Sequence, residues 1–200
     1  MTNRREFIQS GVALSAAPLI FDPAVGVAAH TEPRMKPALA IYDHDFVESR
    51  LFASVLAARG LPTHGIKGDV TSLWYDVLYH RWAAGPSPIV GLTGASSLFC
   101  LEQLAWKVER RVVLRAEHTQ LGNNTVEHRF TGPELLSTLS TDPRIDRSWP
   151  FWSAAAVQGL PATPRRADKC AARAVGSALP ESAAWEEPLV TWAIALKPTA

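Results

Sequence analysis

Short apolar runs alternate with amphipathic stretches between residues 38 and 116, and this alternation constrains the fold more than any other feature. It predicts strands over 38–42, 61–66, 88–93 and 111–116, separated by helices over 46–59, 70–84 and 95–109. Continuously apolar runs are typical of strands buried on both faces. Strands and helices that alternate through short connections favour right-handed βαβ units. The sequence therefore predicts an α/β fold, a three-layer sandwich with a mainly parallel sheet.

The second half of the chain departs from this alternation and predicts antiparallel additions at the edge of the sheet. The turn signal Gly122-Asn123-Asn124 precedes an alternating stretch over 125–130, which predicts a hairpin with the strand over 111–116. Trp149 and Trp152 flank Pro150 at an expected junction between a loop and a helix. The remaining expected elements are a short helix over 133–139, an irregular stretch over 160–184 with a helix near 171–175, and a last strand over 189–196.

The N-terminus carries the sequence Asn3-Arg4-Arg5-Glu6-Phe7-Ile8-Gln9, followed by a weakly apolar run from Val12 to Phe21 and by Val27-Ala28-Ala29. This pattern resembles a bacterial twin-arginine export signal. The resemblance implies export of the folded protein to the periplasm, with the twin-arginine machinery as a partner. The cargo of this pathway often includes cofactor enzymes and their small subunits, so a larger exported oxidoreductase is a further implied partner. The expected domains are a signal peptide over 1–29, a linker over 30–37 and one α/β domain over 38–200.

Charge and cysteine content restrict the function classes. Lys and Arg number 20 and Asp and Glu 19, a balance that argues against nucleic-acid partners held by long-range charge. Every later apolar run is interrupted by charge, Gly or Pro, so we expect no membrane span. The two cysteines, Cys100 and Cys170, form no Cys-x-x-Cys motif, which disfavours thioredoxin-type and covalent haem sites. Cys100 lies in an apolar helix pattern, where a free thiol behaves as a small hydrophobe.

Polar residues follow each of the first four predicted strands. In parallel sheets ligands bind beyond the carboxyl ends of the strands, so these residues predict a ligand-binding site at one edge. The candidate residues are Asp43 and His44 after the first strand, Asp69 after the second, Thr93, Gly94, Ser96 and Ser97 after the third, and Glu117 and His118 after the fourth.

Three chemistries remain open for these residues. A small anion would bind Thr93-Gly94-Ala95-Ser96-Ser97 at the start of a helix, unless Thr93 or Ser96 merely caps that helix. A divalent metal such as zinc, manganese or iron would be held by ligands among Asp43, His44, Asp69, Glu117 and His118. As the alternative to a metal site, Asp45 and Asp69 are helix caps, and His118 and His128 are cross-strand surface residues.

The third chemistry is nucleophilic catalysis, with Ser96 or Cys100 as nucleophile and His44 or His118 as base. The pattern Gly-x-Ser-x-Gly is absent, which leaves this possibility with the least support. The residues therefore favour an exported small-ligand-binding or accessory protein that serves a periplasmic redox enzyme. The alternative is a small metal- or Ser-dependent hydrolase that uses the strand-end polar residues.

Overall fold

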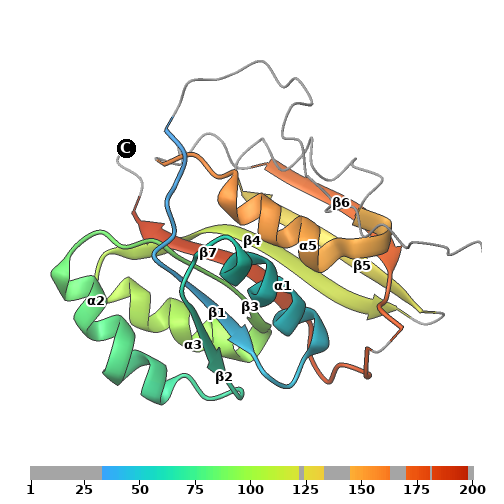
Figure 1. Cartoon of the computed structure of the whole chain (residues 1–200), viewed down its shortest axis with the longest axis horizontal. Coiled ribbons are helices and arrows are strands. Elements are labelled where there is room, and N and C mark those ends of the chain that lie inside the picture. Colours follow the sequence, from blue (N-terminus) through green and yellow to red (C-terminus); the bar gives the residue numbers. More distant parts are fainter. Residues whose placement is uncertain (1–32, 122–123, 133–144, 163–169, 181, 198–200) are drawn as a thin grey trace, which may run out of the picture. The chain divides into compact units, whose positions relative to one another are not determined.

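The computed structural model describes residues 33–121, 124–132, 145–162, 170–180 and 182–197. The seven described strands form one sheet in the order β2-β1-β3-β7-β4-β5-β6 (Figure 1). They are β1 (Leu39–Asp43), β2 (Thr63–Ile66), β3 (Ile89–Gly94), β4 (Arg110–Leu121), β5 (Thr125–Gly132), β6 (Cys170–Ser177) and β7 (Leu189–Leu196). Among these residues, none of the helices is long and apolar enough to cross a membrane.

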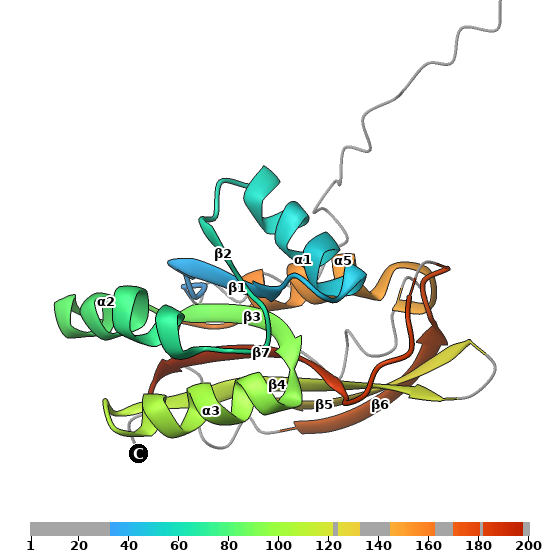
Figure 2. The ribbon, with the colours of Figure 1, turned by 90° about the horizontal axis from the view of Figure 1, so that it is seen from below.

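Helices cover both faces of the sheet, as the edge-on view in Figure 2 shows. On one face lie α1 (Val47–Ala58) and α5 (Ile145–Gln158). On the other lie α3 (Ala95–Trp106), the π-helix η1 (Leu73–Leu78) and α2 (Tyr79–Ala84), which continues from η1. Each face has its own apolar core: Phe52, Leu56, Trp149 and Val157 belong to the first, and Leu73, Leu78, Leu98, Leu101 and Trp192 belong to the second.

The expected α/β class is confirmed, but the expectation of a mainly parallel sheet is wrong. Only β1 with β2 and β1 with β3 pair in parallel. The other four pairings, β3 with β7, β7 with β4, β4 with β5 and β5 with β6, are antiparallel. A continuously apolar run shows that a strand is buried and leaves its direction open. The last strand, β7, inserts between β3 and β4, so antiparallel pairing begins in the middle of the sheet and not at its edge.

The expected helix near 171–175 is also wrong, because these residues lie in the edge strand β6. Alanine-rich sequence favours a helix locally, but antiparallel pairing with the whole length of β5 decides the conformation here. The β4–β5 hairpin is confirmed. Trp149 and Trp152 both lie in α5, which Ser148 interrupts with non-helical backbone angles (φ −154°, ψ 45°). The expected helix over 133–139 and the N-terminal signal lie outside the described residues.

The exposure of Cys100 and the contacts of residues 33–37 both differ from what the sequence suggests. Cys100 is a free thiol on the exposed side of α3, so it is not the buried apolar residue that the pattern suggested. Residues 33–37, which the sequence suggests as part of a linker, contact the residues that directly follow α5. The backbone N–H of Met35 donates to Leu160 (2.8 Å), and the Met35 side chain is buried in the first core.

Candidate functional site

The backbone at the four expected strand ends does meet along one edge of the sheet. The strands β1, β2 and β3 are parallel, and β4 runs in the same direction because two antiparallel pairings separate it from β3. Gly94 of β3 and His118 of β4 both lie opposite Leu189 of the intervening β7. Glu117 and His118 are not at a strand end, however, since β4 continues to Leu121.

The side chains divide between the two faces of the sheet. Ser97 lies on the α3 side, where its hydroxyl donates to the backbone oxygen of Gly68 (2.8 Å). Glu117 lies near Arg115 (3.6 Å), which also pairs with Glu102 of α3 (2.7 Å). His118 points to the opposite face, where its ring packs on Trp149 of α5 (centroids 4.2 Å apart). The residues predicted as one site therefore do not share one crevice.

The N-terminus of α3 already binds a carboxylate, and that carboxylate belongs to the chain itself. Glu187 accepts hydrogen bonds from the backbone N–H and from the hydroxyl of Ser96 (both 2.7 Å). A helix N-terminus with free N–H groups favours negative charge, so the predicted preference for an anion is reasonable in physical terms. Thr93 is engaged separately, because its hydroxyl accepts from the indole of Trp192 (3.0 Å).

The remaining predicted residues stabilise the loops after β1 and β2. The carboxylate of Asp43 accepts from the backbone N–H groups of Asp45 (3.0 Å) and Gly68 (3.1 Å). Asp69 accepts from Thr71 (2.8 Å), and the hydrogen bonds from Thr71 lower the pKa of its carboxyl group. The His44 ring is exposed, packs edge-on against Tyr42 (4.7 Å) and covers Gly65, where a Cβ atom would overlap it.

A pair of buried histidines forms the most unusual polar feature of the fold. His118 and His128 lie directly opposite each other on β4 and β5, and both are fully buried. Their Nδ1 atoms are 2.7 Å apart, and Nε2 of His118 lies 2.8 Å from the hydroxyl of Thr191. The alternative of surface histidines is therefore wrong. The register places the rings together, and α5 covers them.

One hydrogen must lie between the two Nδ1 atoms, because two N–H groups or two lone pairs would repel at this distance. If His118 carries it, then Nε2 of His118 accepts from Thr191, and His128 is protonated on Nε2. If His128 carries it, Nε2 of His128 is an acceptor. The free Nε2 atom of His128 can thus serve as a donor or as an acceptor without any change in charge.

Trp149 covers the histidine pair, and Trp185 packs in turn against Trp149. Trp149 packs on His118 (4.2 Å) and His128 (5.4 Å), and Trp185 packs edge-on against Trp149 (6.1 Å). Burial lowers the pKa of His128 to about 4. Burial, together with the charge of His128, lowers the pKa of His118 well below its usual value. Both rings are neutral at pH 7.

Five enclosed polar atoms on this side of the sheet have no hydrogen-bond partner among the described residues. They are Glu48 Oε1, His128 Nε2, Trp149 Nε1, Ser153 Oγ and Trp185 Nε1. An enclosed polar group without a partner costs about 1–3 kcal/mol, so native proteins seldom leave several of them in one region. We call the side chains of these five residues, with His118 and Thr191, the buried polar cluster.

Glu48 of α1 and Trp149 of α5 lie towards the same end of these two helices. The two helices pack side by side and run in the same direction (Figure 1), and Arg59 hydrogen-bonds Gln158 at their C-terminal ends. Glu48 is in the first turn of α1, Trp149 is in the first half of α5, and Ser153 lies one turn further along α5. This end faces the carboxyl ends of β1 and β3, between which the strand order reverses. Open α/β sheets bind ligands at such a reversal.

Sequence reasoning missed most of the buried polar cluster. His118 was among the predicted site residues, but Glu48, Trp149, Ser153, Trp185 and Thr191 were not. One signal was present in the sequence: His118 shares its strand face with Ala116 and Leu114, and His128 shares its face with Val126 and Phe130. That alternation indicates buried histidines. Within the described part of the chain, no group of three or more His, Cys, Asp or Glu side chains is placed to hold a metal ion.

No protein-family model matches this chain, and neither a curated protein nor a solved structure does.

Proposed function

We propose that this chain is an exported protein that binds a small polar ligand in the buried polar cluster. The observation that supports the proposal is the set of unpaired polar atoms on the face of the sheet where the neutral histidine pair lies, with His128 and Trp149 in direct ring contact. A ligand that supplied their partners would remove a desolvation cost of about 1–3 kcal/mol for each atom. The free energy of binding would include this gain, because the cost is present only in the ligand-free protein.

The unpaired atoms restrict the chemistry of the ligand. The indole N–H groups of Trp149 and Trp185 can only donate, so the ligand presents acceptors, such as the oxygens of a carboxylate or a carbonyl group. The Glu48 oxygen accepts when it is ionised, so a hydroxyl or N–H group on the ligand would complement it. His128 and Ser153 adapt to either role. The aromatic rings around these groups suit a compact molecule with an apolar face.

The resemblance of residues 3–29 to a twin-arginine signal supports a site of action in the periplasm. We propose the role of a binding or accessory protein for a larger exported oxidoreductase. The alternative, a hydrolase that uses the strand-end residues, has less support, because the hydroxyls of Ser96 and Ser97 both donate within the chain.

Loss of the paired arginines should stop export. Replacing Arg4 and Arg5 together by lysine keeps the charge but removes the guanidinium pair that the export receptor reads. We expect the precursor to accumulate in the cytoplasm, measured by cell fractionation and immunoblotting. Arg34→Lys, outside the signal, is the control and should be exported normally. Export of the double variant at the normal level would contradict a twin-arginine route.

Removing one indole N–H should separate ligand binding from folding. Trp149→Phe keeps an aromatic ring on His118 and deletes a donor that has no partner among the described residues. We expect native mass spectrometry of the purified protein to show a bound small molecule, and this variant to bind it about tenfold more weakly, the ratio that 1.4 kcal/mol corresponds to. The control is Trp106→Phe, the same change on an exposed residue of α3.

One result would contradict ligand binding in the buried polar cluster. Suppose that the wild-type chain carries no bound molecule and that Trp149→Phe is as stable as wild type or more stable. The unpaired groups would then be a tolerated cost or be satisfied by water. The binding proposal would fall.

A further inference from the structure

We propose that the segment Ser182–Pro188 is a strap that closes the buried polar cluster, and that a ligand enters when Glu187 leaves the N-terminus of α3. The inference concerns the regulation of the binding site proposed above and rests on that function. The strap itself can be tested without any ligand, so the two proposals can fail separately.

The strap crosses the sheet edge at which the cluster lies. It precedes β7, the strand in the middle of the sheet, and it follows the edge strand β6. Its residues adopt neither helix nor strand. Pro188 ends it at the start of α3, where its backbone oxygen accepts from the N–H of Ala95 (3.0 Å). The segment can therefore move without breaking the pairing of any strand.

A single side chain of β4 holds the first part of the strap. The amide nitrogen of Gln120 donates to the hydroxyl of Ser182 and to the backbone oxygen of Ala183 (both 2.9 Å). The amide oxygen of Gln120 accepts from the backbone N–H of Trp185 (3.0 Å). All of these bonds depend on one partly exposed glutamine, so they form or break together.

Glu187 holds the second part of the strap. Its carboxylate binds the backbone N–H and the hydroxyl of Ser96 at the first turn of α3, as an external anion would. The carboxylate lies where a Cβ atom of Gly94 would be, so only glycine leaves room for it. Gly94 has φ −59°, a value open to any residue, and its missing side chain is therefore explained by the closed strap.

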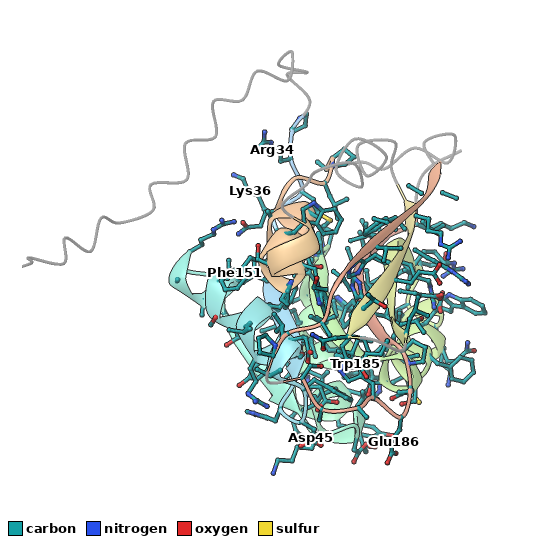
Figure 3. All side chains as sticks on the ribbon, turned by 90° about the vertical axis from the view of Figure 1, so that its right-hand side faces the viewer. Arg34, Lys36, Asp45, Phe151, Trp185 and Glu186 are labelled. Atoms are coloured by element: carbon teal, nitrogen blue, oxygen red, sulfur yellow. The ribbon has the colours of Figure 1, made fainter. Side chains whose placement is uncertain are left out.

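Between these two anchors, Trp185 reaches the buried polar cluster. Its ring packs against Trp149, and its indole nitrogen is enclosed with no hydrogen-bond partner in the described part of the chain. Its neighbour Glu186 is exposed and lies at the margin of the molecule in Figure 3. Opening the strap would withdraw Trp185 from Trp149 and admit solvent or ligand to the histidine pair. Both anchors are polar and partly exposed, which is typical of segments that open locally.

Hydrogen exchange on the full chain tests the strap. In Glu187→Ala we expect the amide of Trp185, which donates to Gln120, to exchange at least about tenfold faster, the ratio that corresponds to about 1.4 kcal/mol. Gly94→Ala should act in the same way, because its methyl group takes the place of the carboxylate. Glu186→Ala, an equal truncation and loss of charge one residue away, should exchange like wild type. Amides of β3 and β7 should be unchanged in all three variants.

A second readout asks whether the strap covers the cluster. Diethyl pyrocarbonate modifies accessible neutral histidines, and peptide mass spectrometry locates the modified rings. We expect His118 and His128 to react faster in Glu187→Ala and Gly94→Ala than in Glu186→Ala. Exchange that stays the same in all three variants would overturn the strap. Faster exchange with unchanged histidine reactivity would overturn its role as a cover. If both readouts rise but no ligand is found by native mass spectrometry, the strap stands and the binding function falls.

Discussion

Acidification from pH 6.5 to about pH 4 should lower the free energy of unfolding by at least about 3 kcal/mol through the buried histidine pair. Burial lowers the pKa of His128 to about 4, against about 6.5 for an unfolded histidine. A shift of about 2.5 units corresponds to about 3 kcal/mol. Burial also lowers the pKa of His118, so this residue lowers the free energy of unfolding in acid as well.

The sign follows from proton binding. Between pH 6.5 and 4 the unfolded chain binds protons on these two residues and the folded chain does not, so acid favours unfolding. The stabilising effect is fully present above pH 6.5, where both states are neutral at these residues. Urea unfolding at several values between pH 7 and pH 4.5 measures how the free energy of unfolding changes with pH.

The carboxylates also respond to acid, so a variant is needed to isolate the histidines. His128→Asn removes one titrating group, and its free energy of unfolding should depend less steeply on pH, even though the variant is less stable at pH 7. His80→Asn, a change at an exposed position of α2, is the control. Equal slopes for His128→Asn and wild type would show that His128 titrates in the folded state as it does when unfolded.

Gly91→Ala should be among the most damaging single methyl additions, with a loss of about 3 kcal/mol of stability. A Cβ atom at this position of β3 would overlap the ring of Trp192 and lie 2.9 Å from the backbone oxygen of Ile41. The Trp192 ring cannot move aside easily, because it is fully buried and its nitrogen donates to Thr93. Chemical unfolding of the purified variant measures the loss.

Gly94→Ala provides the comparison within the same strand. The added methyl group there meets the carboxylate end of Glu187, a flexible side chain that can swing towards solvent. Its cost should therefore be much smaller than that of Gly91→Ala. Replacing Trp192 by leucine in the Gly91→Ala background should recover part of the loss, since a smaller side chain leaves room for the methyl group. Equal losses for the two glycines would contradict this account of the core.

Local pattern determined where most elements lie. The last strand was expected over 189–196 and is observed over Leu189–Leu196, because eight consecutive residues suited to burial leave little choice of conformation. The helices around Leu56 and Leu101 follow from their helical spacing. Ile41, Val90 and Leu78, apolar residues within the predicted strands and helices, are fully buried. In each case the interactions that fix the element form between residues close in sequence, and the apolar side chains can be buried against any apolar surface.

Tertiary structure alone decided which strands pair and in which direction. The apolar pattern of β7 is equally suitable for a parallel or an antiparallel strand, and only its insertion between β3 and β4 set the direction. The stretch around Ala172 favours a helix by itself, yet pairing with β5 makes it a strand.

The same division applies to the candidate site. The sequence by itself determined that polar residues follow β1, β2 and β3 and that a helix N-terminus near Ser96 would attract an anion. It did not determine that Glu187, 91 residues away, supplies that anion. Nor did it show that α5 would cover His118 and His128. Backbone preference and apolar periodicity act over a few residues, whereas hydrogen-bond partners and burial depend on which distant segments the folded chain brings together.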